Sequence, residues 1–181
     1  MRGTKSNQRE MEHQDEQESA GQDVFELLKA DHRRVEELFT RFEDADKRTK
    51  ASIAEEALRE LQVHAQLEEE IVYPAIRDAI DQDDMMDDAR EEHHVAKLLI
   101  KELSKMSVGD EEYRAKFKVL GELVRHHVEE EEHEIIPQAE EADLDAMALG
   151  QEVEQRKEKL MQKYERGGKK SSAPARRKKA A

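Results

Sequence analysis

The sequence predicts an all-α protein: an antiparallel up-down four-helix bundle with an additional C-terminal helix and disordered tails. Three observations support this fold class. The 181 residues include only seven glycines and three prolines, and β-branched runs are scarce, which favours helices over strands. Apolar residues recur at the spacing of an amphipathic helix over four long segments. The connections between these segments are short, so consecutive helices should be antiparallel neighbours.

The first predicted helix starts near Asp23 and fades in residues 43–50. Its inward stripe reads Phe25, Leu28, His32, Val35, Leu38, Phe39 and Phe42. The second helix starts near Ser52, a cap residue with a glutamate three positions later. Its inward stripe reads Ala57, Leu61, His64, Glu68, Ile71 and Val72. Pro74 lies inside this helix because the apolar pattern resumes after it, and an interior proline should bend the helix.

The third predicted helix starts near Asp84 and is broken by the sequence SVGD at residues 107–110. Its inward stripe reads His93, Ala96, Leu99, Ile100 and Leu103. The fourth helix spans residues 110–140, with Pro137 near its end. Its inward stripe reads Phe117, Leu120, Val124, His127, Glu131 and Ile135.

The predicted organisation has four parts. Charged residues make up 42 % of the chain and aromatic residues 4 %, a composition that by itself suggests disorder, but the apolar residues are periodic, so part of the chain should fold. We expect a disordered N-terminal tail (residues 1–21), the bundle (22–140), a mostly solvated helix (141–166) and a basic flexible tail (167–181).

Composition excludes several classes of protein. The chain has no cysteine, so disulfides, zinc-thiolate sites and cysteine nucleophiles are excluded. The N-terminus lacks the apolar segment of a signal peptide, and no apolar stretch approaches the roughly 20 residues that span a bilayer. We therefore expect a cytoplasmic protein without membrane contact.

The net charge of −14 hides an asymmetry along the chain. Residues 166–181 hold seven basic side chains and no acidic one, so the remainder carries −14 − 7 = −21. The acidic body should repel nucleic acid, whereas the basic tail can make weak contact with phosphate groups.

A pattern of two histidines, a glutamate and a proline occurs twice along the chain. The members are, in chain order, His32, His64, Glu68 and Pro74 in the first half, and His93, His127, Glu131 and Pro137 in the second. The offset between the halves is 61 residues for the first histidines and 63 for the second histidines and the glutamates. One slightly longer loop or helix would produce this difference, so the pattern is typical of an internal duplication.

Two histidine doublets leave a choice within this pattern. At His126-His127, the spacing to the following proline selects the second member. At His93-His94, the apolar residues that follow at helical spacing select the first member. We therefore include His93 and His127 and leave His94 and His126 as neighbouring groups.

Each of these residues alone has an ordinary structural interpretation. A single histidine on an apolar stripe is usually a hydrogen-bonded core residue, and consecutive glutamates usually form a solvated face. Here, four histidines and two glutamates fall at inward positions in a duplicated arrangement, and no basic residue lies on those stripes. Because an unpaired buried carboxylate is costly, Glu68 and Glu131 should be neutralised by metal.

The ligand types narrow the choice of metal. Imidazole suits iron, zinc, copper and nickel, and carboxylates prefer harder ions. Six nitrogen and oxygen ligands are too many for one tetrahedral zinc ion. Two bridging carboxylates with four histidines fit a dinuclear centre, so we expect iron or manganese. Ferritin-like proteins bind such pairs through Glu-x-x-His spacing, whereas this chain has His-x-x-x-Glu.

The motif set resembles the hemerythrin-like (HHE cation-binding) family over residues 22–140. The segments that carry the resemblance are DHRRVEELF, HAQLEEEIVYP, EEHHVAKLLIKEL and RHHVEEEEHEIIP. The resemblance implies a four-helix bundle that holds two iron ions with an oxo or hydroxo bridge, and dioxygen or hydrogen peroxide as the small-molecule ligand. Manganese and zinc are the alternative ions. Carried over by position, the terminal ligands would be His32, His64, His93 and His127, with Glu68 and Glu131 bridging.

The chain departs from the family pattern at one position. Oxygen-carrying hemerythrins have a fifth histidine four residues after the third-helix ligand, and the residue there is Lys97. This departure favours binding, sensing or reaction with iron, dioxygen or peroxide over reversible oxygen carriage. Enzyme status is left open, with weak catalase-like decomposition of peroxide as the candidate reaction. The alternative functions are a helical interaction or stress module with a structural metal or none, and weak nucleic-acid contact through the basic C-terminal tail.

Overall fold

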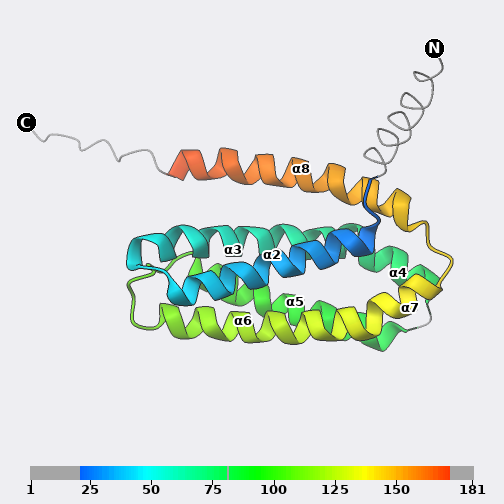
Figure 1. Cartoon of the computed structure of the whole chain (residues 1–181), viewed down its shortest axis with the longest axis horizontal. Coiled ribbons are helices and arrows are strands. Elements are labelled where there is room, and N and C mark those ends of the chain that lie inside the picture. Colours follow the sequence, from blue (N-terminus) through cyan, green and yellow to red (C-terminus); the bar gives the residue numbers. More distant parts are fainter. Residues whose placement is uncertain (1–20, 81, 172–181) are drawn as a thin grey trace, which may run out of the picture.

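The computed structural model describes residues 21–80 and 82–171, and the regular elements within these ranges are helical. The helices follow one another as five long segments (Figure 1). They are α2 (Val24–Asp44), α3 (Lys47–Leu67) continued by η1 (Glu68–Val72) and α4 (Tyr73–Ala79), α5 (Asp83–Leu103), α6 (Tyr113–Glu130) continued by η2 (Glu131–Ile135) and α7 (Ile136–Glu141), and α8 (Ala146–Ser171). The predicted all-α fold class is confirmed.

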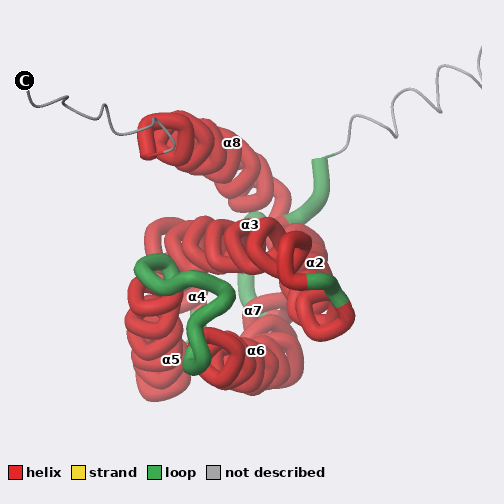
Figure 2. Tube along the Cα trace, turned by 90° about the vertical axis from the view of Figure 1, so that its left-hand side faces the viewer, coloured by secondary structure: helices red, strands yellow, loops and turns green. Residues whose placement is uncertain are grey.

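Four of these segments form the bundle and the fifth lies against its outside. Seen from the end of the bundle, α2, α3, α5 and α6 occupy four corners, and α8 runs beyond α3 and α2 (Figure 2). Residues 1–20 of the predicted N-terminal tail and the part of the predicted basic tail after Ser171 lie outside the described residues.

Two apolar clusters fill the bundle, one toward each end. The cluster toward α4 and α7 includes Leu28, Leu67, Ile76, Met86 and Ile136, and the other includes Leu38, Phe42, Ile100, Phe117 and Leu120. Burial of such a side chain contributes about 1.5–3 kcal/mol to folding. The predicted metal-binding residues lie between the clusters; His32, for example, lies between Leu28 and Val35 on α2. This position surrounds a polar layer with apolar packing on both sides.

The predicted start of the second helix near Ser52 was wrong. Helix α3 begins at Lys47, because the side chain of Asp46 caps it and accepts hydrogen bonds from the backbone N–H groups of Arg48 (2.9 Å) and Thr49 (3.0 Å). Ser52 lies inside the helix, where its hydroxyl donates to the carbonyl of Thr49. Aspartate caps a helix as well as serine does, and here it acts first along the chain.

Both interior prolines are preceded by a turn of π-helix. In η1 the N–H of Tyr73 donates to the carbonyl of Glu68, and in η2 the N–H of Ile136 donates to the carbonyl of Glu131. A proline has no N–H, and its ring crowds the carbonyl one turn earlier, so the wider π turn accommodates it within a continuous helical segment. The repeated spacing from glutamate to proline therefore coincides with a repeated π turn.

Helix α8 packs one face against α2, α3 and η1. Among its side chains in residues 146–164, Val153 and Leu160 are buried and most of the others are exposed. It lies close to the start of α2 at Gly150, where a Cβ atom would be 2.3 Å from the backbone oxygen of Gln22 and 3.1 Å from the backbone nitrogen of Val24. Glycine is therefore needed at this helix crossing.

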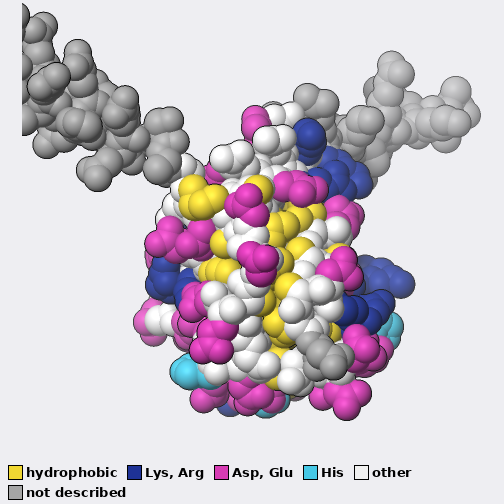
Figure 3. Space-filling view, turned by 90° about the vertical axis from the view of Figure 1, so that its right-hand side faces the viewer, with side chains coloured by type: hydrophobic (Ala, Val, Ile, Leu, Met, Phe, Trp, Pro, Cys, Tyr) yellow, Lys and Arg dark blue, Asp and Glu magenta, His cyan; other side chains and the backbone are white. Residues whose placement is uncertain are grey.

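The surface is strongly charged. Acidic side chains are spread over the end of the molecule that carries α4 and α7, with apolar side chains visible between them (Figure 3). Within the described residues, no helix is both long and apolar enough to cross a membrane.

We expect Gly150→Ala to lower the free energy of unfolding by about 1–3 kcal/mol, the usual cost of overpacking. Alanine is otherwise the better helix former, but the new Cβ would meet backbone atoms that cannot move aside. Urea unfolding measures the change. Gly109→Ala is the matched control, because its Cβ would meet side chains and no backbone: the flexible end of Lys47 at 3.2 Å and the hydroxyl of Ser107 at 3.7 Å. Equal stability of Gly150→Ala and the wild type would contradict the close crossing.

Candidate metal centre

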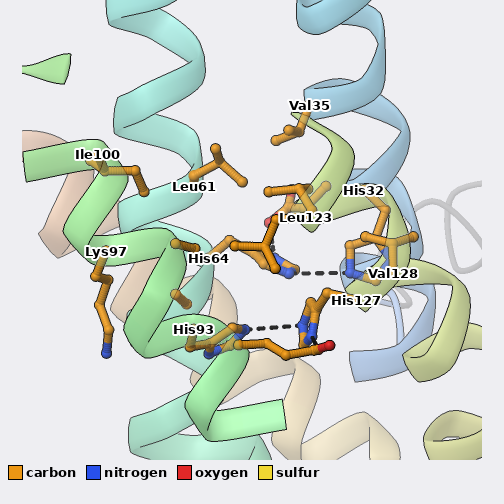
Figure 4. Close-up of a pocket in the computed structure, with 15 residues that line it drawn as sticks. His32, Val35, Leu61, His64, His93, Lys97, Ile100, Leu123, His127 and Val128 are labelled. Carbon is orange, nitrogen blue, oxygen red and sulfur yellow. Dashed lines mark hydrogen bonds and ion pairs between the residues drawn. The ribbon is translucent and has the colours of Figure 1, made fainter. Parts of the chain in front are cut away.

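The six residues predicted as metal ligands lie together in the middle of the bundle. Each is buried, and both glutamates are completely inaccessible to solvent. The four histidines come from four different helices and turn their rings toward one another (Figure 4). In chain order, the residues lie on α2 (His32), α3 (His64), η1 (Glu68), α5 (His93), α6 (His127) and η2 (Glu131).

Two of the histidines form one half of the centre. The Nε2 atoms of His32 and His64 are 3.1 Å apart. An oxygen of Glu131 lies 3.1 Å from Nε2 of His32, and an oxygen of Glu68 lies 3.0 Å from Nε2 of His64. Together these four residues offer ligand atoms that lie within 4.8 Å of one another.

The other two histidines form the second half. The Nε2 atoms of His93 and His127 are 3.0 Å apart. The Oε2 atom of Glu68 lies 3.2 Å from Nε2 of His93, whereas its Oε1 atom faces His64 in the first half. The carboxylate of Glu68 thus presents one oxygen to each half, which is the arrangement of a bridging ligand.

Tyr73 is a site residue that the sequence did not predict. Its buried hydroxyl lies 3.3 Å from Nε2 of His127 and 3.4 Å from Nε2 of His93, so it reaches the second half of the centre. Burial and the carboxylates of Glu68 and Glu131 raise its pKa well above the ordinary value. The corresponding residue in the duplicated half, 63 positions later, is Ile136, so the two halves differ in chemistry.

The buried carboxylates have no hydrogen-bond donor among the described residues. All four oxygens of Glu68 and Glu131 lack a hydrogen-bond partner there, although imidazole nitrogens lie at contact distance. Buried polar atoms are rarely left without a partner, and buried charges are costly without one. Carboxylate oxygens and imidazole nitrogens that converge in this way are a donor set suited to divalent transition metals. The residues therefore fit a pair of metal ions.

The outward nitrogen of each histidine faces a further carboxylate. Nδ1 of His32 donates to Glu132 (2.7 Å) and Nδ1 of His127 donates to Glu92 (2.8 Å). For the other two histidines the contacts are looser: Nδ1 of His64 is 3.7 Å from Asp31, and Nδ1 of His93 is 3.3 Å from Glu69 without hydrogen-bond geometry.

These outer carboxylates also follow the duplication. Asp31 and Glu92 directly precede a predicted ligand, and Glu69 and Glu132 directly follow one. Carboxylates that hydrogen-bond a metal-bound histidine fix its ring and raise its basicity. From sequence, Glu69 looks like the surface charge that consecutive glutamates usually form, and the other three carboxylates were not predicted, although their positions next to the repeated ligands are a usable signal.

The electrostatics of the centre favour the charged forms of His64, His93 and Glu68. Although burial opposes the charge, Glu68 and Asp31 raise the pKa of His64 to about 10. Burial is likewise overcome at His93, where Glu68 and Glu69 raise the pKa to about 9. Despite its own burial, the pKa of Glu68 is held well below its usual range by His64 and His93.

The two neighbouring histidines left out of the predicted set are exposed. His94 lies on the outer face of α5, and the side chain of His126 is 60 % exposed, 3.5 Å from Glu92. Neither belongs to the buried centre.

A small cavity adjoins the histidines on the side away from α4. Its volume is about 30 Å³, enough for one small molecule. Apolar side chains, including Val35, Leu61, Ile100 and Leu123, line most of it (Figure 4). All four site histidines also reach its wall.

Comparisons with known proteins find a matching family model and a solved structure with a similar fold. The family model of the hemerythrin HHE cation-binding domain matches residues 23–139. The crystal structure of a hemerythrin HHE cation-binding domain-containing protein from Mycobacterium kansasii superposes with a TM-score of 0.67; it is 23 % identical, and the match covers 77 % of this chain and 87 % of that one.

A curated relative is similar over a shorter part of its length. A DNA nickase from Nostoc sp. is 26 % identical over 110 residues, which are 60 % of this chain and 31 % of that protein. The chain therefore spans about a third of the length of this relative.

We expect metal binding to release protons. An imidazolium cannot bind a metal, so a cation must displace the protons of His64 and His93, whose pKa values of about 10 and about 9 lie above neutral pH. Metal affinity should therefore rise as the pH increases from neutral toward about 9. Calorimetric titration of chelator-treated protein in buffers with different ionisation enthalpies counts the protons released. Heats that are the same in every buffer would contradict this expectation.

Proposed function

The chain belongs to the hemerythrin HHE cation-binding domain family, and from this premise we propose that it holds two iron ions and binds, senses or reacts with dioxygen or peroxide. The observation that carries the proposal is the set of four buried carboxylate oxygens without hydrogen-bond donors among the described residues. They lie among four imidazole nitrogens, so a pair of cations would give both kinds of atom a partner.

In this proposal, each half of the centre would bind one ion. His32 and His64 would hold one ion, and His93 and His127 the other. Glu68 would bridge the ions, since its two oxygens already face opposite halves of the centre. Glu131 would bridge as the duplicated counterpart of Glu68. Mixed nitrogen and oxygen ligation favours iron, with manganese or zinc as the alternatives.

The size of the cavity fits a small ligand. Its walls are mostly apolar, and the imidazoles reach it, so a molecule of the size of dioxygen or peroxide would lie next to the metal-binding atoms. Iron, when bound, supplies the redox chemistry with oxygen species that protein side chains lack. The surrounding leucine, isoleucine and valine side chains keep bulk water away.

Lys97 argues against reversible oxygen carriage. Its ammonium group is paired with both oxygens of Glu69, at 2.5 and 2.7 Å, and its side chain borders the cavity. It therefore offers no imidazole at the position where the oxygen-carrying relatives have a fifth histidine. We propose reaction or sensing, including weak decomposition of peroxide, in place of carriage.

We expect about two irons per chain in protein expressed with iron and purified in air, measured by elemental mass spectrometry. His64→Ala combined with His127→Ala should remove most of this iron, because one imidazole is lost from each half. His94→Ala combined with His126→Ala is the matched control and should retain it, since both residues are exposed. Wild-type protein without metal, or with a single zinc, would favour a structural helical module.

We also expect the iron-loaded, reduced protein to be oxidised by dioxygen without returning to the reduced form when oxygen is removed. The reason is that Lys97 stands at the position where oxygen-carrying hemerythrins have a fifth histidine. Absorption spectra recorded through cycles of oxygenation and degassing measure the recovery. Full recovery over several cycles would show oxygen carriage and would contradict this part of the proposal.

A further inference from the structure

Helix α8 lies beyond the residues matched by the family model, but one of its side chains contacts a residue that faces the metal centre. The ammonium group of Lys157 donates a short hydrogen bond to Oδ1 of Asp31. The other oxygen of Asp31 faces Nδ1 of His64. Lys157, Asp31 and His64 thus form a chain from the added helix to a predicted metal ligand.

Asp31 does not close onto the histidine that it faces. The Oδ2–Nδ1 distance is 3.7 Å, too long for a hydrogen bond, and His64 Nδ1 has no other partner among the described residues. At the related position in the duplicated half, Glu92 accepts a hydrogen bond of 2.8 Å from His127, and no lysine pairs with Glu92 among the described residues. Asp31, which pairs with Lys157, therefore lies farther from its histidine than Glu92, which pairs with no lysine among the described residues.

Several contacts fix α8 where Lys157 can make this pair. Val153 and Leu160 are buried in the same cluster as Leu28 and Leu67. Next to Lys157, Arg156 forms a two-pronged ion pair with Glu70 on η1, at 2.8 and 3.2 Å. Because these anchors attach α8 to the helices that carry His64 and Glu68, the position of Lys157 is coupled to the centre.

We propose that Lys157 is a positioning residue that holds Asp31 away from His64 and thereby weakens cation binding in the half formed by His32 and His64. This inference rests on the proposed metal pair. A carboxylate that hydrogen-bonds the outward nitrogen of a histidine makes that histidine a better ligand. Lys157 pairs with Asp31 and keeps it from that nitrogen, so α8 acts as a built-in restraint on metal affinity.

The test is the affinity for ferrous iron, measured without oxygen by competition with a coloured chelator. In Lys157→Met, one of the two stepwise dissociation constants should fall about 10-fold, the lower end of the usual effect of such outer partners. Lys157→Arg keeps the charge and should stay close to the wild type. Lys159→Met, at an exposed position on the same helix, is the matched control and should not change the affinity.

A second variant shows whether the effect passes through Asp31. Asp31→Asn should weaken iron binding, because the residue facing His64 loses its charge. If Lys157 acts by holding Asp31, adding Lys157→Met to Asp31→Asn should change little, whereas independent effects would add. Thermal melting of the chelator-treated variants shows whether each remains folded.

The outcomes separate the inference from the function on which it rests. Tighter binding in Lys157→Met that disappears in the Asp31→Asn background supports the inference. Unchanged or weaker binding in Lys157→Met, with two ions still bound by the wild type, overturns the inference alone, since a purely structural role of α8 predicts weaker binding. Failure of the wild type to bind two ions overturns both.

Discussion

The burial of two carboxylates, Glu68 and Glu131, is the constraint on which the rest of the structure depends. Neither side chain is accessible to solvent, and their oxygens lack hydrogen-bond donors among the described residues. Such a layer is tolerable only where positive charge lies beside it, on protonated histidines or on bound metal ions, because moving an unpaired carboxylate from water into a protein core is costly. The apolar clusters on either side keep the layer dry, and the four histidines supply the remaining donor atoms for the cations.

Helical periodicity was sufficient to predict the bundle and the inward positions of the candidate residues. His32 and His64 stand on apolar stripes with the correct spacing, and the structure buries both. Tyr73 was missed because a regular helix would turn Val72, rather than Tyr73, onto the face of Glu68. The π turn shifts that phase by one residue, and single-sequence periodicity does not reveal a π turn.

Charged residues next to the site were also hard to interpret from sequence. In a run of glutamates, Glu69 looks like solvated surface, yet it faces His93 from the outside and is held by Lys97. Lys157 lies far along the chain from Asp31, and such distant pairing depends on how α8 docks. The start of α3 was missed for a local reason, since Asp46 and Ser52 are both competent caps and sequence alone does not rank them.

The duplication gives the centre its symmetry, and later features of the chain break it. Tyr73 places a hydroxyl next to the half formed by His93 and His127. Its counterpart in the duplication, Ile136, is a buried apolar residue. Helix α8 reaches the other half through Lys157. Two ions held in such a centre would therefore have different surroundings, although the six predicted ligands are arranged symmetrically.

The most direct test of a shared metal pair is an anomalous difference map, recorded at the iron absorption edge from crystals of the protein purified in air. Our account predicts two separate peaks inside the bundle, one beside His32 and His64 and one beside His93 and His127, with Glu68 and Glu131 touching both. A single peak, or density for the two glutamates paired only with protein groups, would contradict it.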